Sequence, residues 1–179
     1  MSCVTPAGLP VWARLARWRV RLGFAATAVA LLLAKPTWQS WGTGLVIAVI
    51  GEAIRVWAAG HLEKGKEVTR SGPYRWIQHP LYVGSAVMSV GVVVAARSVV
   101  VAIVAALYMA TTIAAAVRTE ETALRQAFGS TYDDYRASRG ERMVRSFEVS
   151  RVLRNREYRA MLGVAAGFAL LALRIIVLL

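Results

Sequence analysis

The chain has 179 residues, of which 57% are hydrophobic, with a formal net charge of +12 and a mean hydropathy of +0.49. Its apolar stretches are long and almost uncharged, which excludes a soluble globular domain and indicates an integral membrane protein. Because the basic residues flank these stretches, lipid head groups and topology explain them and nucleic acid is not an expected partner. The single cysteine, Cys3, excludes an intramolecular disulfide, and the sequence spacing of His61 and His79 suggests no metal site.

Five apolar segments predict an all-α, polytopic membrane protein with about five transmembrane helices. They are centred on residues 22–34, 42–62, 81–96, 98–117 and 161–179. The second, fourth and fifth approach the roughly 20 residues that a bilayer requires. The first is shorter, so its helix must extend into flanking residues or its arginine side chains must reach toward the lipid head groups. We expect one membrane domain over residues 1–179, composed of an N-terminal helix at 11–35, a core at 51–147 and an additional C-terminal transmembrane helix at 160–179.

The first apolar segment also fits the pattern of a signal peptide, because four arginines precede it. No small-x-small cleavage site follows, since Leu33-Ala34-Lys35-Pro36 interrupts that pattern. We therefore expect a retained helix.

The basic residues predict the orientation in the membrane. Of the 22 lysines and arginines, 18 fall on one side of a five-span arrangement, and Lys35 and Arg97 fall on the other. The positive-inside rule then places the N-terminus, residues 60–80 and residues 118–158 in the cytoplasm. We expect the inner membrane of a bacterium, with the active site on its cytoplasmic face.

Two opposite charges lie inside the second span. Glu52 and Arg55 are three positions apart and so share a helical face, where an unpaired charge would be costly. We expect them to pair, either as a structural ion pair that fixes helix packing or as one wall of a polar cavity.

A polar insert at residues 68–84 separates the second and third spans. Its two prolines disfavour helix at the residues before them, which predicts a compact loop of fixed shape. Such a loop would hold Tyr74, His79 and Tyr82 on one surface, where we expect chemistry. The alternative is an ordinary juxtamembrane turn whose aromatic side chains lie among lipid head groups.

The fourth span continues without proline or glycine as far as Gly129. This pattern predicts an unbroken helix that carries Glu120 and Glu121 just beyond the membrane surface. The alternative is a solvated helix face with local pairs such as Glu121–Arg125. Residues 130–133 predict a capping box that opens the next helix.

The motifs of the loop and of the fourth helix, taken together, are similar to a known family. They are Gly72-Pro73-Tyr74, His79-Pro80-x-Tyr82-x-Gly84 and Glu120-Glu121-x-x-Leu124-x-x-x-Phe128-Gly129-x-x-Tyr132-x-x-Tyr135, preceded by Gly51-x-x-x-Arg55-x-Trp57. In this order and over residues 51–147 they resemble the isoprenylcysteine carboxyl methyltransferases and their relatives, which include phospholipid N-methyltransferases.

The resemblance implies a methyltransferase that binds S-adenosylmethionine at the cytoplasmic membrane surface, between the His-Pro loop and the double-glutamate helix. It would transfer a methyl group to an amphipathic or lipid-like acceptor, such as a carboxylate or an amine. The cofactor-binding residues that the resemblance implies are Lys66, Glu67, Val68, Thr69, Tyr74, His79, Pro80, Leu81, Tyr82 and Glu120.

The acceptor side departs from the eukaryotic members of that family. Ala116 stands where they have a substrate-binding arginine, four residues before the first glutamate. We therefore expect Arg118, Arg55 or Glu52 to line the acceptor side as the catalytic residues, and a natural acceptor other than a prenylated protein terminus.

Two other functions fit the same sequence. Some membrane sterol reductases carry a similar His-Pro-x-Tyr core, which leaves an NADPH-dependent lipid reductase open. Such an enzyme needs a cluster of basic residues for the 2'-phosphate, and the candidates are Lys64, Lys66, Arg70 and Arg75. The other alternative is a membrane scaffold without catalytic activity.

Overall fold

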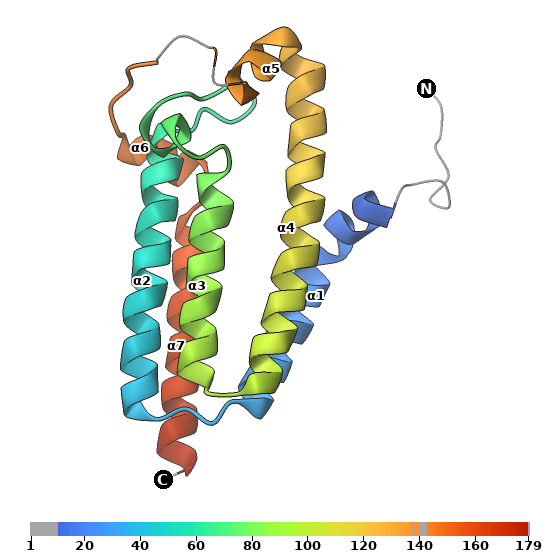
Figure 1. Ribbon diagram of the computed structural model, residues 1–179. Coiled ribbons are helices and arrows are strands. Elements are labelled where there is room, and N and C mark those ends of the chain that lie inside the picture. The colour runs from blue at the N-terminus through green and yellow to red at the C-terminus, as the bar shows by residue number, and fades with distance from the viewer. Residues whose placement is uncertain (1–10, 138, 140–142, 179) are drawn as a thin grey trace.

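The structure, a computed structural model, describes residues 11–137, 139 and 143–178, and every regular element in these residues is helical (Figure 1). The elements are α1 (Val11–Leu33), α2 (Trp38–His61), the 3-10 turn η2 (Gly72–Arg75), α3 (Pro80–Ala96), α4 (Val99–Phe128), α5 (Ser130–Arg136), α6 (Val149–Arg154) and α7 (Tyr158–Leu178). Cys3 lies outside the described residues. The predicted all-α class is confirmed.

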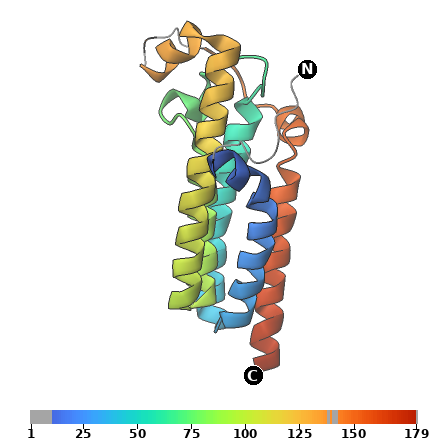
Figure 2. The same cartoon turned by 90° about the vertical axis from the view of Figure 1, so that its right-hand side faces the viewer.

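Five long helices form the membrane part of the protein. Among the described residues, α2, α4 and residues Tyr158–Val177 of α7 are long and apolar enough to cross a bilayer, while Arg21–Leu33 and Pro80–Ala96 are shorter apolar helices. These helices run side by side, with the C-terminus at one end (Figures 1 and 2). Large apolar side chains on their outer surfaces, such as Phe24 and Leu162, are exposed, as expected of helices that face lipid tails.

Helices α2 and α3 pack closely because glycines occupy their interface. A methyl group on Gly51 would lie 2.7 Å from the carbonyl oxygen of Gly84, and one on Gly91 would lie 2.5 Å from that of Gly44. Only a hydrogen in place of the side chain lets two helix backbones approach so closely, which is a common device in membrane proteins. The spacing of these glycines therefore fixes the contact between α2 and α3.

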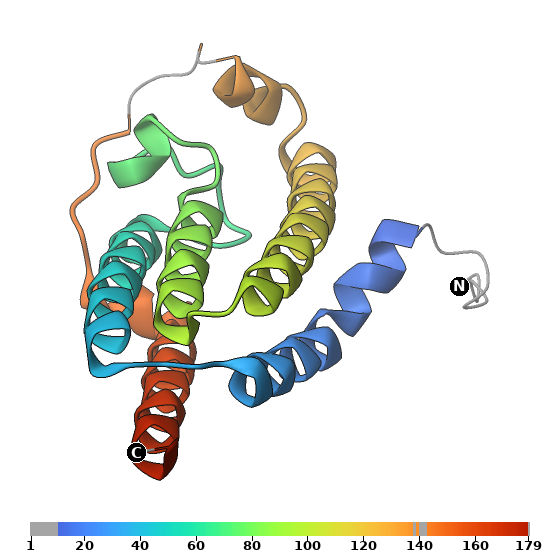
Figure 3. The same ribbon diagram turned by 60° about the horizontal axis from the view of Figure 1, so that its bottom comes forward.

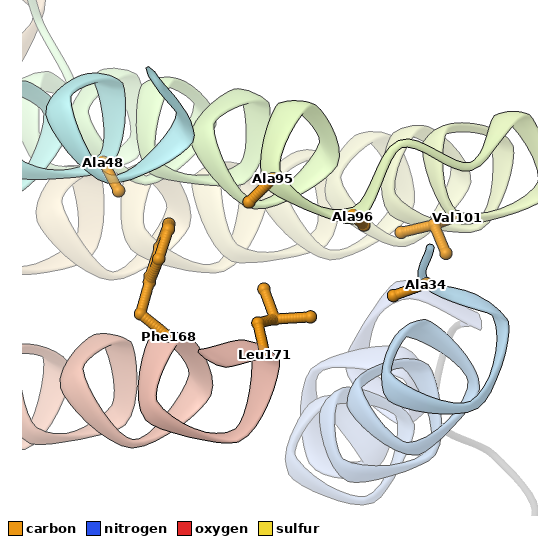
Figure 4. Close-up of a cluster of buried hydrophobic side chains, with 7 residues drawn as sticks. All are labelled: Ala34, Ala48, Ala95, Ala96, Val101, Phe168 and Leu171. Carbon is orange, nitrogen blue, oxygen red and sulfur yellow. The ribbon is translucent and has the colours of Figure 1, made fainter. Parts of the chain in front are cut away.

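The core lies toward the end of the bundle where the chain passes from α1 to α2 and from α3 to α4. Figure 4 shows Phe168 and Leu171 of α7 directed toward the alanines of this region. The indole Nε1 of Trp41 also donates a hydrogen bond to the carbonyl oxygen of Phe168, at 2.8 Å. Helix α7 is thus packed into the bundle.

The opposite end of the bundle gathers the remaining elements. The loop between α2 and α3, together with α5 and α6, lies there (Figure 1), and α2, α3 and α7 are grouped apart from α1 and α4 (Figure 3). Helix α4 extends unbroken over 30 residues and ends at Gly129, whose φ of +50° favours glycine, as the sequence predicts.

The predicted capping box at residues 130–133 is wrong. Helix α5 begins at Ser130, immediately after Gly129, and no side chain caps its start. Because Ser130 is already the first helical residue, its hydroxyl does not occupy the capping position.

Candidate functional site

A cavity of about 570 Å³ lies at the end of the bundle that carries the loop and α5. Its walls are the end of α2, the loop before α3, the first turn of α3, the second half of α4, and α5. Its volume lies within the range of about 300–1,000 Å³ that is usual for small-molecule sites.

Most of the cofactor-binding residues implied by the resemblance line this cavity. They are Glu67, Val68, Thr69, Tyr74, His79, Leu81, Tyr82 and Glu120. Two others do not: Pro80 is buried in the first turn of α3, and the side chain of Lys66 is 72% exposed and 3.8 Å from Glu63. The loop and α4 therefore bring residues that are far apart in the sequence to one place.

Two polar atoms of the cavity residues are buried without a hydrogen-bond partner among the described residues. They are the hydroxyl of Tyr74 and Nε2 of His79. Burial, reinforced by the negative charge of Glu120, raises the pKa of Tyr74 well above its usual value, so its hydroxyl remains a neutral donor. Buried polar groups normally have partners, and these two atoms are consistent with a polar ligand that supplies them.

His79 lies between the two adjacent glutamates of α4. Its Nδ1 is 3.9 Å from Glu120 Oε2, and its Nε2 is 3.6 Å from Glu121 Oε1, beyond hydrogen-bonding distance. Glu120 lines the cavity, whereas Glu121 lies 3.6 Å from Arg136. The local Glu121–Arg125 pair is not formed, because Arg125 donates instead to Asp133 of α5, at 3.2 Å.

Helix α5 is hydrogen-bonded to the loop that lines the cavity. The Tyr135 hydroxyl donates to the carbonyl oxygen of Tyr74, at 3.0 Å, and Nη2 of Arg70 donates to the carbonyl oxygen of Thr131, at 2.6 Å. Burial raises the pKa of Tyr135 to about 12, so this hydroxyl keeps its proton and its hydrogen bond at neutral pH. The cavity is thereby closed on the α5 side.

Sequence reasoning missed the segment that holds the other side of the cavity. Residues 145–157, which we name the C-terminal strap, donate side-chain hydrogen bonds to the last carbonyl oxygens of α2. The pairs are Asn155 Nδ2 with Ala59 and Leu62, both at 3.0 Å, Arg151 Nη1 with Gly60 at 2.9 Å, and Arg145 Nη1 with His61 at 3.4 Å. Carbonyl oxygens at the end of a helix lack the N–H group four residues further along, so these bonds add to the backbone bonds that Ala59 accepts from Leu62 and Gly60 accepts from Glu148.

The strap also holds the two glutamates of the loop. Arg145 binds Glu67 through both of its terminal nitrogens, with Nη2 to Oε2 at 2.8 Å, and this hydrogen bond raises the pKa of Arg145. Arg151 and Arg154 bind Glu63, at 3.0 and 2.8 Å. The loop that lines the cavity is therefore held by arginines at least 78 positions further along the chain.

Of the three predicted acceptor-side residues, only Arg55 is among the described residues that line the cavity. Arg55 lines the cavity, but its main partner is Glu157 of the strap, which sequence reasoning missed. Glu52 lies 3.8 Å from Arg55 and outside the cavity lining, and both of its buried carboxylate oxygens lack a hydrogen-bond partner among the described residues. Arg118 is exposed and outside the lining, whereas Ala116 is part of it.

A second cavity, of about 400 Å³, lies deeper in the membrane part between α1, α3, α4 and α7. Its described lining residues include no charged side chain, and its polar members are Thr27, Ser89 and Tyr108. The chemistry of this cavity suits a hydrocarbon chain better than a polar ligand.

Comparisons with known proteins place this arrangement in a family. The nickel-cobalt-cadmium resistance protein NccN of Alcaligenes xylosoxydans xylosoxydans is 30% identical over 134 residues, which cover 68% of this chain and 60% of that protein. The chain thus spans less than two thirds of the length of this relative. No solved structure is a match for the chain. The model of the phospholipid methyltransferase family matches residues 25–131, which include the glycine contacts of α2 and α3, the loop and the double-glutamate helix, and the chain therefore belongs to the phospholipid methyltransferase family.

Proposed function

We propose that the protein is an S-adenosylmethionine-dependent methyltransferase that methylates a lipid-like acceptor at the cytoplasmic face of the membrane. The observation that carries the proposal is the single cavity lined by Tyr74, His79 and Glu120, although 41 positions of sequence separate the last two. Membership of the phospholipid methyltransferase family supports it independently.

The side chains of the cavity suit the chemical groups of this cofactor. Glu67 and Glu120 offer carboxylates, which favour an ammonium or sulfonium group, and Tyr82, Tyr132 and Tyr135 offer aromatic faces. Lys64 offers a charge for a carboxylate. The unpartnered atoms of Tyr74 and His79 described above would gain their hydrogen bonds from such a ligand.

Methyl transfer requires little acid–base catalysis from the protein. When bound, S-adenosylmethionine supplies a methyl group that is already activated by its attachment to a cationic sulfur. The residues of the chain therefore act by orienting both reactants and by keeping water out. The loop held by the strap and the α5 helix tied to Tyr74 give the cavity the fixed walls that this task requires.

The deeper apolar cavity supports a lipid-like acceptor. It lies between helices of the membrane part, about seven residues of α4 below the nearest lining residue of the candidate site, Ala116. At the 1.5 Å rise of a helix this is roughly 10 Å, a distance that a short length of hydrocarbon chain covers. The closer likeness to isoprenylcysteine carboxyl methyltransferases stays a prediction.

The NADPH-dependent reductase is less well supported. Only Arg55 and Lys64 provide an arginine or lysine to the described lining, and Arg55 is already paired with Glu157. A 2'-phosphate therefore finds no cluster of free arginines there.

Calorimetry on detergent-purified protein tests the proposal. S-adenosylhomocysteine should bind, and binding should weaken in His79→Ala and Glu120→Gln but not in Arg139→Ala, whose side chain is 74% exposed. Binding of NADPH instead would favour the reductase. Binding of neither compound by folded protein would favour the scaffold and refute the proposal.

A further inference from the structure

All three nitrogens of the Arg55 guanidinium group donate to protein partners. Its Nε donates to Glu157 Oε2 at 3.1 Å, and its Nη2 donates to Oε1 and Oε2 of the same carboxylate at 3.0 and 2.7 Å. Its Nη1 donates to the hydroxyl of Ser85 and to the carbonyl oxygen of Leu81. Each of the three guanidinium nitrogens of Arg55 therefore already donates to a protein acceptor.

The geometry of this pair is that of an arginine bound to an anionic ligand. Glu157 meets Arg55 in the bidentate arrangement by which arginine recognises carboxylates, and both residues line the candidate cavity. The side chains are 17% and 7% exposed, so removing either partner would leave a largely buried, unpaired charge, which is costly. The carboxylate of Glu157 thus occupies the position that the carboxylate of an acceptor would need.

The surroundings add further negative charge. Glu52, which is not among the described lining residues, lies 3.8 Å from Arg55, so two carboxylates lie near one guanidinium group. The remaining lysine or arginine among the described lining residues is Lys64, in the loop. An anionic acceptor would meet repulsion from Glu157 and a guanidinium group whose three nitrogens already have protein acceptors.

We infer that Glu157 is a specificity-determining residue: by occupying Arg55, it excludes acceptors whose reacting end is a carboxylate or another anion. The inference rests on the proposed function and narrows its acceptor to an amine or an uncharged nucleophile. An enzyme can gain specificity by rejecting the wrong substrate, and a residue that does so need not contact the favoured substrate.

A purely structural role predicts a different behaviour. If the pair only fastens the strap to α2, then removing Glu157 leaves a buried, unpaired arginine and lowers stability, and a small anion cannot enter to replace the lost carboxylate. If the carboxylate of Glu157 fills a ligand position, the space that it leaves is open to the cavity and an added carboxylate can occupy it.

Chemical rescue of Glu157→Ala separates these roles without any methylation. The melting temperature of the purified variant is measured in sodium propionate and in sodium chloride of equal ionic strength, beside the wild type and the double variant Arg55→Met/Glu157→Ala. We expect propionate to raise the melting temperature of Glu157→Ala by several degrees and to leave the other two unchanged, since a ligand stabilises only the form that binds it. If propionate leaves the melting temperature of Glu157→Ala unchanged, or raises the melting temperatures of all three proteins equally, the inference is overturned.

The second measurement uses Glu157→Gln, which keeps the size of the side chain and removes its charge. Methylation of a long-chain alkylamine and of a fatty acid is compared in the variant and the wild type. We expect the ratio of carboxylate to amine turnover to rise at least tenfold in the variant. Efficient methylation of the fatty acid by the wild type, or an unchanged ratio, contradicts the inference. Failure of S-adenosylhomocysteine to bind would refute the proposed function instead, and the propionate experiment would still report on Glu157.

Discussion

Replacing Arg145 by methionine should weaken cofactor binding, although Arg145 is not among the residues that line the cavity. Arg145 holds the carboxylate of Glu67, which does line it, and also donates to the last turn of α2. Methionine keeps much of the side-chain length and loses every hydrogen bond, so Glu67 is left without the partner that fixes its position. The change therefore tests whether the strap positions the cofactor-binding loop.

The size of the effect follows from the burial of the pair. The side chains of Arg145 and Glu67 are 20% and 27% exposed, so their contact lies between a surface ion pair and a buried one. A hydrogen bond to a charged group contributes about 1.5–3 kcal/mol, and a loss of about 1.4 kcal/mol from binding is tenfold in affinity. We therefore expect about a tenfold weaker affinity for S-adenosylhomocysteine in Arg145→Met.

Arg154 supplies the matched control. It is also an arginine of the strap bound to a loop glutamate, Glu63, but its side chain is 56% exposed and Arg151 holds the same carboxylate. Arg154→Met should thus change affinity less than about twofold, as expected for an exposed pair. Arg145→Lys should fall between the wild type and Arg145→Met, because lysine keeps the charge and loses the two-pronged contact.

Calorimetry gives the affinities, and thermal unfolding of the same samples gives the stabilities. An affinity of Arg145→Met within twofold of the wild type would refute the positioning role. So would equal losses in Arg145→Met and Arg154→Met, because the effect would then belong to the strap in general. A lower melting temperature with unchanged affinity would show that Arg145 serves stability only.

Three further predictions follow from the fold and the site. Gly84→Ala should cost about 1–3 kcal/mol of stability, because the added methyl would lie 2.6 Å from Cγ of Arg55, whereas Gly163→Ala, with open space around it, should be neutral or stabilising in thermal unfolding. His79→Ala should lower the affinity for S-adenosylhomocysteine while the protein stays folded, and an unchanged affinity would place His79 outside the cofactor site. A cysteine at Arg70 should resist an impermeant thiol reagent on intact cells, and ready labelling would overturn the predicted orientation.

The sequence predicts the helical fold well because membrane spans leave a strong local signal. Runs of about 20 apolar residues identified α2, α4 and α7, the helices that the structure shows to be long and apolar enough to cross a membrane. Helix α4 was also predicted to continue to Gly129, since no residue before that position disfavours helix. The start of α5 was misplaced, because Ser130 is a good capping residue by type and the backbone conformation that decides the matter is not visible in the sequence.

That Tyr74, His79 and Glu120 lie at one cavity was predictable because these residues belong to short motifs. Tyr74 and His79 lie within one loop, and Glu120 is marked by the unusual pair of adjacent carboxylates, so a resemblance was sufficient to suggest that they meet. The acceptor side was not predictable in the same way. Glu52 and Arg55 share a helical face and do lie 3.8 Å apart, but Arg55 binds Glu157 more closely, 102 positions away. Local spacing shows which residues share a face and does not show which distant residue will pack against it.

The contacts that the sequence did not predict come from residues beyond the end of the family match. The match ends at residue 131, and the residues that it includes build the loop, the double-glutamate helix and Arg55. The side chains that fix Glu67 and occupy Arg55 lie beyond that boundary, in the strap that leads into α7. A segment outside the common core can thus change which acceptors are admitted without altering the cavity residues that we propose for the cofactor. In this chain, Glu157 of that segment binds the guanidinium group of Arg55, which is the contact on which the inferred exclusion of anionic acceptors depends.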